Sequence, residues 1–216
     1  GTRTPQTRTM LKVALPLLVV SASSIISSNA DTIMLGWLSN TREVGFFSVA
    51  ARLGLLTSFF HMLTTSSLTP KVAALYGQNK KDELQKMVQQ VTKGLGIIGL
   101  AGVIVFVLAG KYILNLWGNE FTVEYLPLVI ISIGQFFNIA TGATGVILIM
   151  TGNEKIVGYL STFSVIINLI LNYLLIPKYG AVGAAFTTAL TISISNIIKL
   201  LLVKKQIGIW TIPLNH

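Results

Sequence analysis

Six long apolar runs limit what this chain of 216 residues can fold into. They extend over about 10–35, 44–68, 91–108, 125–150, 156–176 and 181–203. A helix of about 20 mostly apolar residues crosses a bilayer, and each run approaches or exceeds that length. Only 11% of the residues are charged, against about 25% in soluble domains. We therefore expect an all-α integral membrane bundle of six transmembrane helices over residues 10–205, between a segment 1–9 and a tail 206–216.

The basic residues predict how this bundle sits in the membrane. One side collects Arg3, Arg8, Lys12, Lys71, Lys80, Lys81, Lys86, Lys93, Lys155, Lys199, Lys204 and Lys205. The other side has only Arg42, Lys111 and Lys178. By the positive-inside rule both termini lie in the cytoplasm, which agrees with an even number of spans. The net charge of +9 falls between apolar runs rather than along a stripe with aromatics, so we expect membrane lipids and no nucleic acid as partners.

Two opposite charges interrupt the first two apolar runs. Asp31 lies near the end of the first run and Arg52 near the start of the second. Counted at 1.5 Å per residue from the turn between them, both lie about 7–15 Å into their helices, at one depth. A charge inside an apolar helix costs about 2.5–3.5 kcal/mol, so it usually pairs or borders water. Either Arg52 neutralises Asp31 in a buried pair, or its planar guanidinium binds a phosphate or another anionic headgroup.

Small polar residues precede Asp31 on the same helical face. Ser21, Ser24, Ser28 and Asp31 recur at spacings of three, four and three, with Ser27 and Asn29 beside them. Such a stripe permits close helix packing with hydrogen bonds between helices. It also fits the wall of a polar cavity in which Asp31 carries a proton or a cation. Both interpretations stay open.

Three further polar groups lie within the apolar runs. His61 either hydrogen-bonds to neighbours such as Thr57, Thr64 and Thr65 or carries protons. On the fourth run, Gln135 and Asn138 share a face with glycines that either packs closely or lines the same cavity. On the fifth run, Asn168 and Asn172 are spaced to hydrogen-bond a neighbouring helix.

The connections carry signals of their own. Pro70 is expected to end the second helix. Residues 71–93 form either a short amphipathic helix at the membrane surface or a solvated charged loop. No metal-ligand spacing, Gly-rich phosphate loop or paired carboxylates occur within a run. We therefore expect no enzyme, no cofactor and no metal site.

Three motifs bear a family resemblance. The segment 168–190 ends one run at Pro177, turns at Gly180 and continues with Gly183-Ala184-Ala185. The hairpin formed by the first two runs contains Asp31-Thr-Ile-Met-Leu-Gly36, Glu43-Val-Gly45 and Ala50-Ala-Arg-Leu53. The loop Tyr76-Gly-Gln-Asn-Lys-Lys-Asp-Glu-Leu84 follows the second run. In order and spacing, these resemble the C-terminal lobe of polysaccharide flippases in the multidrug/oligosaccharidyl-lipid/polysaccharide exporter superfamily.

The resemblance implies one lobe of a two-lobe transporter in the cytoplasmic (inner) membrane, with the N-terminal lobe missing from this chain. Such a flippase moves an undecaprenyl-diphosphate-linked oligosaccharide by alternating access for O-antigen or capsule assembly. Arg52 and Asp31 match the family's Arg and Asp. Here Arg52 would attract the diphosphate or a sugar acid, and Asp31 would set its charge state or couple H+ or Na+. Ser24, Ser28, Gln135 and Asn138 would contact sugar hydroxyls. The alternatives are a cation-coupled multidrug exporter of the same superfamily and a membrane scaffold that transports nothing.

Overall fold

The protein is all-helical along the part of the chain that the structure covers. The structure, a computed structural model, describes residues 4–213, and of 4–13, Ser28 and Thr41 it describes only the backbone. The elements are α1 (Thr4–Leu38), α2 (Thr41–Gly77), α3 (Lys81–Asn115), the 3-10 helix η1 (Asn119–Glu124), α4 (Tyr125–Ala140), α5 (Thr144–Met150) and α6 (Glu154–Ile207). No strand occurs between residues 4 and 213. The predicted all-α class is confirmed.

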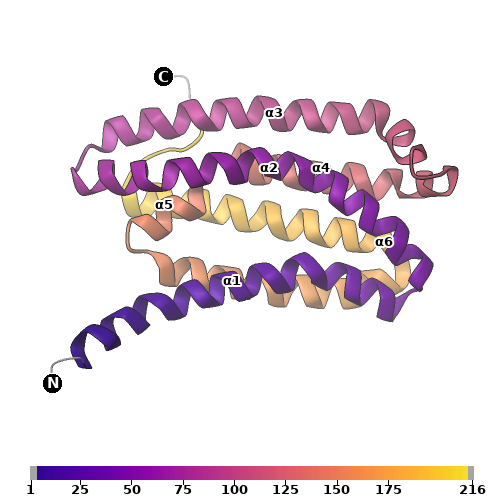
Figure 1. The fold of residues 1–216 in the computed structure, drawn as a ribbon, viewed down its shortest axis with the longest axis horizontal. Coiled ribbons are helices and arrows are strands. Elements are labelled where there is room, and N and C mark those ends of the chain that lie inside the picture. Colours follow the sequence, from indigo (N-terminus) through magenta and orange to yellow (C-terminus); the bar gives the residue numbers. More distant parts are fainter. Residues whose placement is uncertain (1–3, 214–216) are drawn as a thin grey trace.

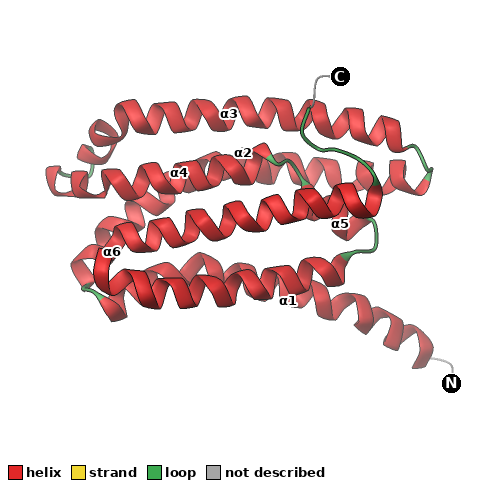
Figure 2. Cartoon of the chain, turned by 180° about the vertical axis from the view of Figure 1, so that it is seen from behind, coloured by secondary structure: helices red, strands yellow, loops and turns green. Residues whose placement is uncertain are grey.

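The long helices lie roughly side by side and form one bundle. α3 and α1 lie on opposite sides of it, with α2, α4 and the C-terminal part of α6, drawn in yellow, between them (Figure 1). Seen from behind, the connections are short loops at the two ends of the bundle (Figure 2). One hollow is lined by Asn40, Glu120 and Tyr179, which belong to the connections after the first, third and fifth predicted spans. These three connections, predicted to lie on the outer side, therefore meet at the same end of the bundle.

Helix α6 is a hairpin of two arms rather than one rod. Gly180 interrupts it with φ 54° and ψ −133°, a conformation open essentially to glycine. A β-carbon on Gly183 would lie 2.7 Å from the carbonyl oxygen of Leu175, whereas eight residues of a straight helix advance about 12 Å. The chain therefore reverses at Gly180. The arms 154–179 and 181–207 correspond to the predicted fifth and sixth spans.

The described helices have the length and composition of membrane spans. Four of them qualify, and the bent pair Ala14–Ser27 and Asn29–Leu38, which meet at 41°, raises the count to five. The 54-residue α6 enters this count once although it has two arms. The fold is thus a multi-pass bundle that agrees with the six predicted helices.

The helices differ from the expected spans at three places, and one expectation, that Pro70 ends a helix, is wrong. α2 continues through Pro70 to Gly77, because membrane helices tolerate a proline whose freed carbonyl finds another partner. α3 runs without a break from Lys81 into the third span, and its first turns bury Leu84 and Val88 completely in the core, so residues 81–93 are helical and not a solvated loop. The fourth span is broken between α4 and α5, where Gly142 takes φ +76°.

The apolar core leaves the middle of the bundle polar. One buried cluster, which contains Val72, Leu84, Ile147 and Val203, packs near α5 and the end of α6. A second cluster contains Leu35, Phe47, Ile131, Ile176 and Ala184 and packs near the Gly180 turn. Tight packing at both ends fixes the helices around a cavity between the two clusters.

Candidate functional site

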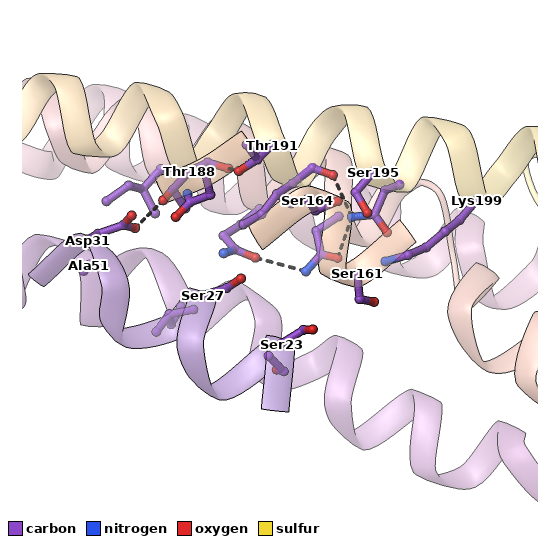
Figure 3. Close-up of a pocket in the computed structure, with 18 of the residues that line it drawn as sticks. Ser23, Ser27, Asp31, Ala51, Ser161, Ser164, Thr188, Thr191, Ser195 and Lys199 are labelled. Atoms are coloured by element: carbon purple, nitrogen blue, oxygen red, sulfur yellow. Dashed lines mark hydrogen bonds between the residues drawn. The ribbon is translucent and has the colours of Figure 1, made fainter. Parts of the chain in front are cut away.

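A cavity of about 390 Å³ lies inside the bundle, between α1, α2, α4 and both arms of α6. This volume is within the range of ligand pockets. α1 contributes Ser23, Ser24, Ser27 and Asp31, and α4 contributes Gln135 and Asn138. The arms of α6 contribute Ser161, Ser164, Asn168, Thr188, Thr191, Ser195, Asn196 and Lys199. Most of the lining residues carry a hydroxyl or an amide, and one full charge of each sign is among them (Figure 3), while apolar side chains such as Phe47, Leu55 and Ile131 supply the larger part of the wall.

Local sequence explains why these walls are polar. Thr188, Thr191, Ser195 and Lys199 recur at spacings of three and four along the second arm of α6, so they share one helical face. α4 approaches this arm closely, because a β-carbon on Gly134 would lie 2.6 Å from the Cα of Ala189. The absence of a side chain at residue 134 therefore brings the amide face of α4 against the hydroxyl face of α6.

Asp31 is the centre of a buried cluster at one end of the cavity. Its side chain is 8% exposed. The amide of Asn172 donates to its Oδ1 at 2.6 Å, and the hydroxyl of Thr188 donates to its Oδ2. Asn172 also donates to Oδ1 of Asn168 at 3.2 Å. Three helical segments thus meet at one carboxylate, which ties α1 to both arms of α6.

A chain of amides crosses the middle of the cavity. Asn196 donates to Oδ1 of Asn138 at 3.1 Å, and Asn138 donates to Oε1 of Gln135 at 3.1 Å. The hydroxyl of Ser58 on α2 donates to the same Gln135 oxygen. These bonds connect α2, α4 and α6 through side chains that face the cavity, so the network holds the amides in fixed positions.

Lys199 lies at the opposite end of the cavity from Asp31 (Figure 3). Thr188, which bonds Asp31, precedes Lys199 by eleven residues on the same arm, a rise of about 16 Å. Within the described residues no ion pair joins the two charges. The sequence-based count assigned Lys199 to the cytoplasmic side with the loop lysines, whereas the structure places its side chain inside the bundle.

The structure brings together some of the predicted site residues. Ser24, Asp31, Gln135 and Asn138 line the cavity, whereas Asn29, Arg52 and His61 do not. The side chain of Ser28 lies outside the described part of the chain. Of the expected stripe on α1, Ser24 and Asp31 line the cavity and Ser21 does not, whereas Ser23 and Ser27, which were not in the stripe, do.

Two contacts that the sequence left as open alternatives do not occur among the described residues. Arg52 is exposed, and within the described residues it forms no ion pair with Asp31. The reason is that Asp31 faces α6, which supplies both of its donors. The threonines expected around His61 instead bond backbone carbonyls of α2, as Thr65 does with the carbonyl of His61 itself.

Sequence reasoning missed most of the α6 lining. Thr188, Ser195, Asn196 and Lys199 carried a detectable signal, a polar face on the last apolar run. Ser161 and Ser164 carried the same signal on the run before it. Asn172 was expected only to bond a neighbouring helix, and it does so by donating to Asp31.

The arrangement offers a binding chemistry of its own. Oδ1 of Asn172 is buried with no hydrogen-bond partner among the described residues, and it belongs to the side chain that contacts Asp31. A carboxylate beside amide and hydroxyl oxygens suits a proton or a small hard cation. Residues 4–213 contain no group of three His, Cys, Asp or Glu side chains placed to hold a metal ion.

Comparison with known proteins gives the family. The sequence profile named MatE matches residues 16–174. The capsular polysaccharide biosynthesis protein CapF of Staphylococcus aureus is 30% identical over 191 residues, which cover 88% of this chain and 47% of CapF. The probable low-salt glycan biosynthesis flippase Agl15 of Haloferax volcanii is 24% identical over 83% of this chain and 38% of its own length.

The relatives also include multidrug resistance proteins. The multidrug resistance protein NorM of Photobacterium profundum is 27% identical over 202 residues, 86% of this chain and 42% of NorM. The chain thus spans less than half the length of these three relatives. The profile match extends from α1 into the first arm of α6 and includes Asp31, the α4 amides and Asn172. The chain belongs to the MatE family.

Proposed function

We propose that this chain is the C-terminal lobe of a transporter that flips a lipid-linked oligosaccharide across the cytoplasmic (inner) membrane for surface polysaccharide assembly. The missing N-terminal lobe would complete a two-lobe protein that works by alternating access. Both ends of the present chain would lie in the cytoplasm. The observation that carries the proposal is a polar cavity inside an apolar bundle whose relatives include a capsular polysaccharide protein.

The cavity chemistry supports a sugar-bearing substrate. Hydroxyls and amides such as those of Ser24, Gln135 and Asn138 pair well with sugar hydroxyls, since each group donates and accepts hydrogen bonds. The Asp31 cluster would couple movement to H+ or Na+. A bound cation would neutralise the negative charge of the Asp31 carboxylate and tighten the contact between α1 and α6. Release of the cation would loosen that contact.

Arg52 has a separate role in this proposal. It is exposed on α2 and lies eleven residues from the start of that helix, about 16 Å deep. An unpaired arginine facing lipid at such depth is costly, so it should border water or another protein surface. We therefore place it at the cleft between the two lobes, where it would attract the diphosphate or a sugar acid.

The test uses the full-length protein in a strain from which its gene has been deleted. Wild type should restore export of the surface polysaccharide, and Arg52→Ala should abolish it at equal membrane abundance. Arg42→Ala is the matched control, because Arg42 is exposed at the end of the bundle and pairs with Glu120. Unchanged export by Arg52→Ala would remove Arg52 from the mechanism. Unaltered polysaccharide in the deletion strain itself would refute the function.

A cation-coupled multidrug exporter is the second candidate, favoured by the NorM and MdtK relatives and by the Asp31 cluster. The same deletion strain separates the two functions. Drug sensitivity with normal polysaccharide would identify an exporter, and loss of polysaccharide with normal drug tolerance would identify a flippase.

A further inference from the structure

Lys199 presents a cation to the interior of the cavity. Figure 3 shows its side chain running back along α6 toward Ser161 and the middle of the cavity, rather than toward the nearer end of its helix. The following basic residues, Lys204 and Lys205, are exposed at that end. Side chains of an α-helix lean toward its N-terminus, and at this position that lean places the ammonium group in the cavity instead of at the end of the helix.

The described residues supply no acceptor for this cation. Lys199 forms no hydrogen bond or ion pair with any of them. Asp31, the other charged residue of the lining, already accepts from Asn172 and Thr188. An unpaired charge within a membrane bundle is costly and usually marks the path of a ligand.

Of the residues the structure describes, Lys199 is the one cation in the lining of this cavity. His61 on α2 does not line it and adds no second cation to this end. The hydroxyl of Ser161 and the amide of Asn196 line the same end of the cavity.

We propose that the Lys199 end of the cavity binds an oxyanion, a carboxylate or phosphate group of the transported molecule. This site rests on the proposed transport function. It specifies that function further, because it requires that the part of the transported molecule held inside this lobe carries a negative charge. The polar middle of the cavity then holds neutral hydroxyls, and Lys199 anchors the charged group by a charge-assisted hydrogen bond. The oxyanion comes either from an acidic sugar or from the diphosphate of the lipid carrier.

The test measures anion binding to the purified full-length protein in detergent by isothermal titration calorimetry. The probes are glucuronate, inorganic phosphate and neutral glucose. Wild type should bind at least one of the anions more tightly than glucose. Lys199→Met should weaken that binding about tenfold or more, and Lys199→Arg should preserve it to within a few-fold. Lys205→Met, which removes an exposed lysine from the same helix, is the matched control and should bind as wild type does.

The two sources of the oxyanion give different outcomes. Selective loss of glucuronate binding supports an acidic sugar, and selective loss of phosphate binding supports the lipid diphosphate. Equal affinities of wild type and Lys199→Met for every anion would overturn the site, as would an equal loss in Lys205→Met. Polysaccharide export by wild type in the deletion strain is read separately. Export with anion binding that does not depend on Lys199 would refute this site and leave the proposed function standing.

Discussion

Replacing Thr188 with valine tests whether the Asp31 cluster holds α1 against α6. Thr188→Val keeps the shape of the side chain and removes the hydroxyl that donates to Oδ2 of Asp31. The carboxylate then keeps the bond from Asn172 at 2.6 Å and loses its other side-chain donor. Hydrogen bonds to charged groups contribute about 1.5–3 kcal/mol, whereas bonds between membrane helices average about 0.6 kcal/mol with a maximum of about 1.7. We expect a loss of about 1–2 kcal/mol.

The neighbouring residue provides an internal control. Thr187 is completely buried, and its hydroxyl has no hydrogen-bond partner among the described residues. Thr187→Val removes the same atom one position away but breaks no bond. Because a buried hydroxyl without a partner costs free energy, this variant should be as stable as wild type or more stable. The two isosteric changes should therefore differ in sign or clearly in size.

The assay is unfolding of the purified full-length protein in mixed micelles of increasing SDS content, followed by circular dichroism. A double-mutant cycle with Asp31→Asn isolates the pair, and a coupling free energy of about 0.5 kcal/mol or more is expected for groups in contact. Equal stability of Thr187→Val and Thr188→Val, or a coupling near zero, would show that the Thr188 hydroxyl does not stabilise the carboxylate.

Three further substitutions test the fold around the cavity by the same unfolding measurement. Gly180→Ala should destabilise by about 1–3 kcal/mol, because φ 54° with ψ −133° is strained for any side chain. Gly134→Ala should cost about 1–3 kcal/mol, because its methyl group would lie 2.6 Å from the Cα of Ala189. Arg42→Ala should change stability by less than about 1 kcal/mol, since its 3.1 Å pair with Glu120 is exposed.

Gly45→Ala is the control for both glycine variants. Gly45 lies within α2 and is exposed, and a β-carbon there meets no atom within 4 Å. This change should leave stability equal or raise it by about 0.5–1 kcal/mol. A loss as large as that of Gly180→Ala would contradict the turn geometry. Unchanged stability of Gly134→Ala would show that α4 and α6 can separate without a cost in free energy. A large loss of stability in Arg42→Ala would show that the ion pair with Glu120 stabilises the fold.

Much of the fold could be predicted because its signals are local. The length of an apolar run indicates a spanning helix whatever it packs against, and residues 156–176 and 181–203 became the two arms of α6. The turn at Gly180 was predictable from its glycine and the proline before it. Pro70 misled the prediction, because in a long membrane helix neighbouring contacts outweigh one missing backbone bond.

The candidate site was predictable only in part. The spacing of Ser24 and Asp31 identified the polar face of α1, and Gln135 and Asn138 identified that of α4, because helical periodicity fixes which residues share a face. The same rule, applied to the last run, would have found Thr188 and Lys199. It gave no information about Arg52, since periodicity places a residue on a face without saying what that face meets.

The sequence alone determined that this chain is a helical membrane protein with polar stripes on several spans, because apolar length and helical spacing are properties of each segment by itself. Only the tertiary structure decided which stripes meet. The rotation of each helix about its axis depends on packing with its neighbours, as where Gly134 meets Ala189. That packing turned Asp31 toward Asn172 and Thr188, left Arg52 exposed and brought Lys199 into the cavity.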